Sequence, residues 1–146
     1  MPDINDFSIG RQCQIVIRHP LAVGGRLDLT IVTDFDAKPK HKDIKVDGLD
    51  GLNRAKVLPE GWDVSIGLDR ANSAAEDFCG AMENAYYDSG NVPTGTVYQY
   101  ITETDGSLTT YVFEGVALKL DDAGSWKSDS AVKQKMMGHA TRRRRL

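Results

Sequence analysis

Apolar and polar residues alternate along much of the chain, which is the pattern of half-buried β-strands. From Trp62 to Leu68 (WDVSIGL) every second residue is apolar and the residues between are polar or small. Successive side chains of a strand point to opposite faces, so this segment predicts a strand with one buried face. Cys13 to Arg18 (CQIVIR) and Leu27 to Val32 (LDLTIV) are rich in β-branched residues and predict a hairpin.

A second hairpin is predicted in the C-terminal half. Thr96 to Glu103 (TVYQYITE) and Leu108 to Leu120 (LTTYVFEGVALKL) flank a turn that contains Asp105 and Gly106. An Asp-Gly pair supplies the positive φ angles of a tight hairpin turn. Gly115 interrupts the second run and predicts a bulge. A weaker alternation predicts a final strand from Ala131 to about Thr141.

One segment, from about Ser73 to Ser89, has convincing helical periodicity. Ser73 and Glu76 have the spacing of a capping box, and Gly90 with Pro93 would end the helix. The residues of the predicted apolar stripe are Ala74, Phe78, Ala81, Met82 and Ala85. The predicted fold class is therefore mainly β with one helix packed on an antiparallel sheet.

A long polar segment from Asp36 to Asn53 (DAKPKHKDIKVDGLDGLN) separates the strands. We predict a loop here, and long loops in compact domains are uncommon and often functional. Its spaced apolar residues favour an arm that orders against a neighbouring subunit, although alternating lysines are also typical of a solvated strand edge. The candidate interface residues are Lys38, Lys40, Lys42, Ile44, Lys45, Val46, Asp47, Leu49, Asp50 and Leu52.

The length and composition are those of one globular domain spanning residues 1–146. Hydrophobic residues make up 40% of the chain and charged residues 27%, and no apolar run is long enough to cross a bilayer. The first ten residues contain acidic side chains and no apolar core of a signal peptide. We expect a protein that is made in a cytosol and does not enter a membrane.

The charge is distributed unevenly. Arg142, Arg143, Arg144 and Arg145 form a basic tip at residues 142–146, and without them the net charge of -3 would be -7. Phosphate binding needs positive charge spread over a face, so an acidic body with a basic tip is poorly suited to wrapping nucleic acid. The tip could bind nucleic acid, pair with acids of a neighbouring subunit, or remain a disordered tail. We expect it to face a protein neighbour, either another subunit or a surrounding sheath.

Residues with catalytic or ligand-binding chemistry are sparse and scattered. Cys13 and Cys79 belong to no metal or redox motif and are interpreted as ordinary buried thiols. His19, His41 and His139 are isolated, and we interpret them as surface or turn residues. No glycine-rich nucleotide motif or calcium loop is complete. We therefore predict no catalytic residue, no metal and no cofactor, and a protein that is not an enzyme.

Three tyrosines leave a nucleic-acid-binding alternative open. Tyr98, Tyr100 and Tyr111 could stack on bases, as aromatic residues do in single-strand-binding proteins. Aromatic pairs across a hairpin more often stabilise the sheet itself. The structural interpretation is favoured.

From about Asp36 to Arg145 the chain shares a series of motifs with tail proteins of bacteriophages. They are Pro59-Glu60-Gly61-Trp62, the Asp69-Arg70 pair, a helix ending in Tyr86-Tyr87, the ITETDG hairpin, the EGVALKLDDAG segment and a final strand ending in arginines. In these motifs the chain resembles the tail tube proteins of contractile-tailed phages. Their fold is shared with baseplate tube-like proteins and with the type VI secretion tube.

The resemblance implies an antiparallel β-sandwich or half-barrel with a flanking helix. Six copies would form a ring whose sheets join into one barrel, and stacked rings would form a tube through which phage DNA passes without specific binding. The implied partners are other copies, tail sheath and baseplate proteins, and the implied location is the virion tail, assembled in the host cytoplasm. A baseplate or tube-end adaptor of the same fold is the alternative, and a small nucleic-acid-binding β-domain is a less favoured one.

Overall fold

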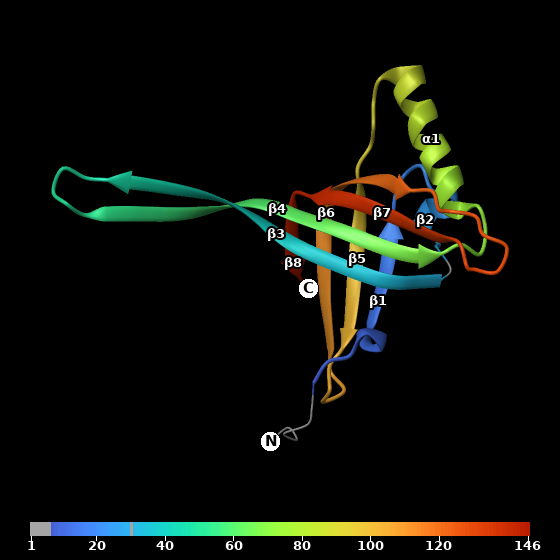
Figure 1. Ribbon diagram of the computed structural model, residues 1–146, viewed down its shortest axis with the longest axis horizontal. Helices are drawn as coiled ribbons and strands as arrows, with labels where there is room; N and C mark the ends of the chain where they lie inside the picture. The colour runs from blue at the N-terminus through green and yellow to red at the C-terminus, as the bar shows by residue number, and fades with distance from the viewer. Residues whose placement is uncertain (1–6, 30) are drawn as a thin grey trace.

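The computed structural model describes residues 7–29 and 31–146 as a β-rich fold with one long helix (Figure 1). The strands are β1 (Cys13–Arg18), β2 (Arg26–Leu27), β3 (Ile31–Asp47), β4 (Asn53–Asp69), β5 (Gly95–Thr102), β6 (Leu108–Asp122), β7 (Lys133–Ala140) and β8 (Arg142–Arg145). The helix is α1 (Ala74–Ser89), and short 3-10 turns span Gly10–Gln12 and Val23–Gly25.

All strand pairs are antiparallel and form one sheet that does not close on itself. The order is β2-β1-β5-β6-β7-β4-β3, with β8 paired to β6 beside this path. The first half of β6 lies between β5 and β8, and its second half pairs with β7. The two halves of the sheet cross at a steep angle (Figure 1). The predicted fold class, mainly antiparallel β with one helix, is confirmed.

A bulge in β6 allows one strand to serve both halves of the sheet. Val97 pairs with Phe113 but Gly95 pairs with Val116, so β6 has one extra residue at this point. Gly115 has a φ of 60°, in the left-handed region that glycine adopts without strain. Bulges bend a strand and increase its twist. The bulge predicted at Gly115 is confirmed.

The core lies between the two halves of the folded sheet. Phe113 on β6 is fully buried, and its ring meets Phe35 of β3 and Trp62 of β4 at centroid distances of 5.9 and 6.0 Å. The apolar phase predicted for β4 is buried, with Val64, Ile66 and Leu68 each at most 3% exposed. The other core residues are Ile17, Leu27, Leu29, Ala75, Phe78, Val97, Val116, Leu118, Met136 and Ala140.

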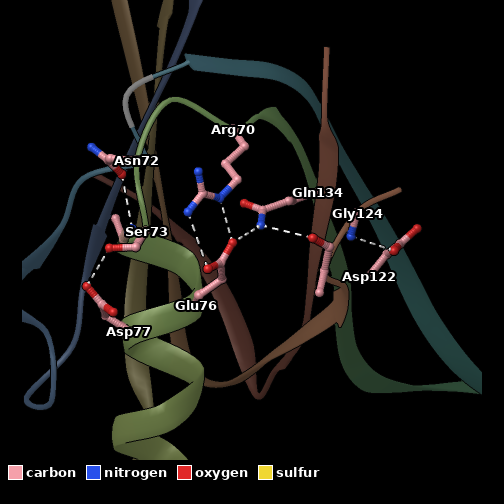
Figure 2. A network of polar contacts seen from close by, with 10 residues as sticks. Arg70, Asn72, Ser73, Glu76, Asp77, Asp122, Gly124 and Gln134 are labelled. Carbon is pink, nitrogen blue, oxygen red and sulfur yellow. Dashed lines mark hydrogen bonds and ion pairs between the residues drawn. The ribbon is translucent and has the colours of Figure 1, made fainter. Parts of the chain in front are cut away.

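Helix α1 closes one end of this core, but its predicted capping box does not form. The Ser73 hydroxyl donates to Asp77, and the side chain of Asn72 accepts from the N–H of Ala74 at 3.0 Å (Figure 2). Glu76 instead accepts from Nε of Arg70 at 2.6 Å and from Nε2 of Gln134 at 2.9 Å. A charge-assisted bond to a guanidinium is stronger than one to a backbone N–H, so the carboxylate turns away from the helix end.

The Glu76 contacts attach the start of α1 to the sheet. Gln134 belongs to β7, is 2% exposed, and also donates to the carbonyl oxygen of Ala123. The hydrogen bond from Arg70, assisted by that from Gln134, lowers the pKa of Glu76. At its other end the helix stops at Gly90, whose φ of 71° is left-handed. The predicted end at Gly90 is confirmed.

One predicted strand has other boundaries in the structure. The first hairpin forms, but β2 contributes only Arg26 and Leu27 to it, and Ile31 already begins β3. The chain crosses here from one edge of the sheet to the other, so the predicted strand over residues 27–32 is divided; residue 30 lies outside the described residues. The predicted hairpin over β5 and β6 is confirmed, with Thr102 opposite Leu108.

Candidate assembly surfaces

The most prominent feature of the molecule is a two-stranded arm. Strands β3 and β4 pair along their whole length, from Ile31 opposite Asp69 to Asp47 opposite Asn53. Strand β7 supports β4 only from Trp62 onward, so residues 41–59 project beyond the sheet (Figure 1). We call residues 41–59 the arm. The predicted loop over residues 36–53 is wrong as to secondary structure, because residues 36–47 continue β3.

A second bulge lies where the arm leaves the sheet. Pro39 pairs with Trp62 but His41 pairs with Pro59, so β4 contains one extra residue between them. Gly61 lies in this bulge with a φ of 93°, and a side chain there would collide with the carbonyl oxygen of Ala140. Only glycine fits both conditions. The Pro59-to-Trp62 motif therefore encodes the junction that directs the arm away from the core.

An ionic cluster holds the base of the arm. One oxygen of the Asp63 carboxylate lies 3.2 Å from Nζ of Lys40, and the other lies 2.8 Å from Nδ1 of His139. The hydrogen bonds from His139 and Lys40 lower the pKa of Asp63. Lys40, a predicted interface residue, thus has its main partner within the chain. Lys38 similarly lies 3.7 Å from Asp36.

The strand register divides the arm into two unlike faces. Directly opposed residues share a face, so Lys42 with Leu58, Ile44 with Lys56, and Val46 with Arg54 form one face. This face, which we call the apolar-cationic face, carries three aliphatic and three basic side chains. The opposite face carries Asp43 with Val57, Lys45 with Ala55, and Asp47 with Asn53. All twelve residues are exposed.

The arm ends in a turn with exposed leucines. Leu49 lies in this turn and is fully exposed, and Leu52 is 57% exposed. The Asp50 carboxylate forms an ion pair with the guanidinium of Arg54 at 2.8 Å. The structure therefore places Lys42, Ile44 and Val46 together, puts Lys45 and Asp47 on the other face, and gathers Leu49, Asp50 and Leu52 at the tip.

The four arginines form a strand rather than a disordered tail. Strand β8 continues the register of β7 along β6, with Arg142 opposite Glu114 and Arg145 opposite Tyr111. The guanidinium of Arg143 lies over the rings of Trp62 and Tyr111, 3.9 and 4.2 Å from their centroids. Arg144 forms an ion pair with Glu114. Two of the four charges thus have partners within the chain.

The open ends of the sheet face one another across a cleft. Strands β1 and β2 line one side and the first residues of β3 line the other, around a volume of about 1060 Å³. Neither β1 over Cys13–Val16 nor β3 has a second strand partner within the part of the chain that the structure describes. Unpaired edges of this length favour association with another strand.

A second groove lies between α1 and the second half of β6, with a volume of about 340 Å³. Phe78, Met82 and Leu118 are among its lining residues, and Tyr86, Tyr87 and Val92 at its rim are 55%, 80% and 47% exposed. Helix α1 contains four acidic residues and no lysine or arginine. We call this surface the α1 groove. The sequence indicated it only through the Tyr86-Tyr87 pair.

Within residues 7–29 and 31–146, no group of three or more His, Cys, Asp and Glu residues could hold a metal ion. Cys13 and Cys79 are free and partly buried. No helix in the described part of the chain is long and apolar enough to span a membrane.

Of the histidines predicted to be surface or turn residues, His19 is buried and begins a turn. His19 is 2% exposed, directly after β1, and its ring packs edge-on against Phe78 at 4.7 Å. Nδ1 accepts the N–H of Leu21, so Nε2 carries the proton and donates to the carbonyl oxygen of Pro93. Burial lowers the pKa of His19. It is a core histidine that holds the turn after β1.

Comparison with known proteins gives a likeness in structure alone. No protein-family model and no curated protein matches the sequence. A chain of the sheath/tube terminator of PVC, an extracellular contractile injection system, superimposes with a TM-score of 0.67 at 11% identity, covering 99% of both chains. The fold is that of contractile injection system components.

Two further structures show the same likeness. A chain of the anti-feeding prophage cap, which terminates the tube, has a TM-score of 0.65 at 10% identity and covers 100% of this chain and 95% of that chain. A chain of the PVC sheath–tube complex has a TM-score of 0.63 at 11% identity, with 91% and 88% covered. This agrees with the tail-tube-like fold predicted from the sequence motifs.

Sequence reasoning missed several residues within this injection-system fold. Trp62, Tyr111 and Glu114, which contact the arginine strand, lie 28 or more residues from it in sequence. Leu58, Lys56 and Arg54 complete a face of the arm but lie beyond the segment selected for its polarity. Only the hairpin register brings them beside Lys42, Ile44 and Val46.

Proposed function

We propose that this protein is a non-enzymatic structural subunit of a contractile tail, forming hexameric rings that stack into the tube through which phage DNA passes. The observation that carries the proposal is the end-to-end likeness of the fold to chains of sheath–tube, terminator and cap assemblies. Tail sheath and baseplate proteins are the expected partners.

The open sheet supports ring formation. Its two ends, β2 with β1 on one side and β3 on the other, are different surfaces, so edge pairing between copies would be head-to-tail. Head-to-tail contacts generate closed rings when the rotation between copies closes. Ring closure into a common barrel would remove the unpaired edges of every subunit.

The charge distribution supports passage of DNA without tight binding. Without its last four arginines the chain has a net charge of -7, and within the last strand Arg143 is stacked on aromatic rings and Arg144 is paired with Glu114. Phosphates are repelled by acidic surfaces, and a channel lined with free arginines would retain them. We therefore place β8 toward a subunit or sheath and away from the channel.

A tube-end role is the second candidate. The superposition on the terminator chain covers 99% of this chain and 99% of that chain. The superposition on the sheath–tube chain covers 91% of this chain and 88% of that chain. A terminator or baseplate adaptor with this fold would form a single ring on the end of a tube made of another protein.

Negative-stain electron microscopy of the purified protein distinguishes these roles. A tube subunit should polymerise into tubes or stacks of six-membered rings as concentration rises. Isolated rings that never stack would favour the tube-end role, and a strict monomer at all concentrations would contradict both. Tight, salt-sensitive binding of short DNA would instead favour the nucleic-acid-binding alternative.

A further inference from the structure

The arm exposes aliphatic side chains that no other described part of the chain covers. Ile44, Val46 and Leu58 are 38%, 55% and 44% exposed on the apolar-cationic face. A two-stranded ribbon with no third strand or covering helix is only marginally stable in water. Exposed aliphatic side chains gathered on one face mark an interaction surface. Lys42 and Lys56, on the same face, form no ion pair within the described residues.

The α1 groove has the complementary properties. Its floor is formed by apolar side chains, among them Phe78 and Leu118, and its rim exposes the rings of Tyr86 and Tyr87. The charged residues of the lining are Glu83 on α1 and Lys119 on β6, and both are exposed. A second exposed acid of the helix, Asp88, lies five residues beyond Glu83 and is not among the lining residues of the groove.

We propose that the α1 groove of one copy binds the apolar-cationic face of the arm of a neighbouring copy. The aliphatic residues of the arm would cover the groove, and Lys42 and Lys56 would lie on the α1 side of it, near Glu83. This inference rests on the proposed function, in that it identifies the surface that receives the arm when copies assemble.

The geometry requires the contact to be between molecules. The arm projects from one end of the sheet, and α1 rises from the other (Figure 1). The arm therefore cannot fold back into its own groove while β3 and β4 remain paired. Because the donor and acceptor surfaces are different, each copy can give one arm and receive another, which is the head-to-tail arrangement of rings and stacks. Opposite charges around an apolar centre also fix register and partner choice.

Cysteine crosslinking tests the contact directly, because the groove already contains Cys79. In a Cys13→Ser background, Val46→Cys places a thiol on the apolar-cationic face. Lys45→Cys is the matched control, since Lys45 lies on the opposite face of the same strand. Burial raises the pKa of the Cys79 thiol, so oxidation is carried out with a mild oxidant at alkaline pH.

The expected result is an intermolecular disulfide between positions 46 and 79, identified by mass spectrometry of the crosslinked peptides. The control should give less than about a tenth of that yield, since its thiol points away from the groove. Equal yields, or a position-46 thiol that never captures Cys79, would overturn the inference. If rings or tubes form without the crosslink, the proposed function stands and only this contact is wrong.

A charge exchange gives an independent measurement. Lys56→Glu or Glu83→Lys alone should raise the critical concentration for assembly about five-fold, and the double variant should restore most of the loss, as for an exposed ion pair. Additive losses in the double variant would show that these two charges do not meet. Both sites are exposed, so the monomer fold should be retained and can be checked by circular dichroism.

Discussion

The guanidinium carbon of Arg143 lies 3.9 Å from the centre of the Trp62 ring, and Trp62 itself packs against the core. The same carbon lies 4.2 Å from the centre of the Tyr111 ring. A planar guanidinium can stack on two rings, which an ammonium group cannot do equally well. Arg143→Ala should lower the free energy of unfolding by about 1–2 kcal/mol, and Arg143→Lys should recover less than half of this.

Urea unfolding of the two Arg143 variants measures the effect. Arg145→Ala is the control, because Arg145 is an exposed residue of the same strand. An Arg143 variant no less stable than the Arg145 variant would show that the stacking contributes nothing.

Phe78 is the larger of the two buried side chains that pack α1 against the core, the other being Ala75. Phe78 is 3% exposed and touches the ring of His19. Phe78→Ala should destabilise the protein by about 3–5 kcal/mol, because it leaves a cavity as well as removing buried apolar surface. The side chain of Tyr87 on the same helix is 80% exposed, so Tyr87→Ala should change the free energy of unfolding by less than about 0.5 kcal/mol. Similar values for both variants would mean that the helix does not pack through Phe78.

Gly61 should tolerate no side chain. Gly61→Ala would force a left-handed alanine against the carbonyl oxygen of Ala140 and should cost at least about 1–2 kcal/mol. Gly80→Ala is the matched control, since nothing lies within 4 Å of the added methyl group in α1 and the change should be neutral or stabilising. Thermal unfolding of both variants is sufficient, and a stable Gly61→Ala protein would exclude the proposed role of the bulge.

Glu76 should make stability depend on acid pH. Its pKa is lowered from the ordinary value of 4.5, so the unfolded chain binds the proton more tightly than the folded one. The contribution of Glu76 is therefore complete above pH 4.5 and is lost as the pH falls through the lower, folded-state pKa. Glu76→Gln should be less stable than the wild type at neutral pH, and the difference should shrink in acid.

Urea midpoints of both proteins across this pH range test the Glu76 prediction. The other carboxylates with lowered pKa values, such as Asp63, are present in both proteins and cancel in the difference. A difference that stays constant with pH would show that the charge of Glu76 is not what attaches the helix.

Removal of the arm should separate folding from assembly. Replacing residues 42–58 with an Asn-Gly turn leaves the pairing of β4 with β7 intact, because that pairing begins at Trp62. We expect a folded protein whose circular dichroism resembles that of the wild type but which no longer forms stacks in electron micrographs. Long tubes from the shortened protein would contradict the assignment of the arm to inter-subunit contact.

The local patterns of the sequence determined most of the elements. Alternation identified the buried face of β4, Asp-Gly identified the turn between β5 and β6, and Gly90 identified the end of α1. These features depend on residues that are close in sequence. The strand periodicity and the backbone conformation of glycine act over a few residues, so they can be recognised without the fold.

Tertiary structure alone decided the assembly surfaces. Residues 41–47 look like a loop because both faces of the arm are exposed, which removes the one-sided pattern that reveals a strand. Glu76 left its capping position because Arg70 and Gln134 lie beside it in space. The arginines form a strand whose side chains stack on Trp62 and Tyr111 and pair with Glu114. In each case the stabilising partner is distant in sequence. Such a contact forms only when the chain folds, so the local propensity of the sequence cannot predict it.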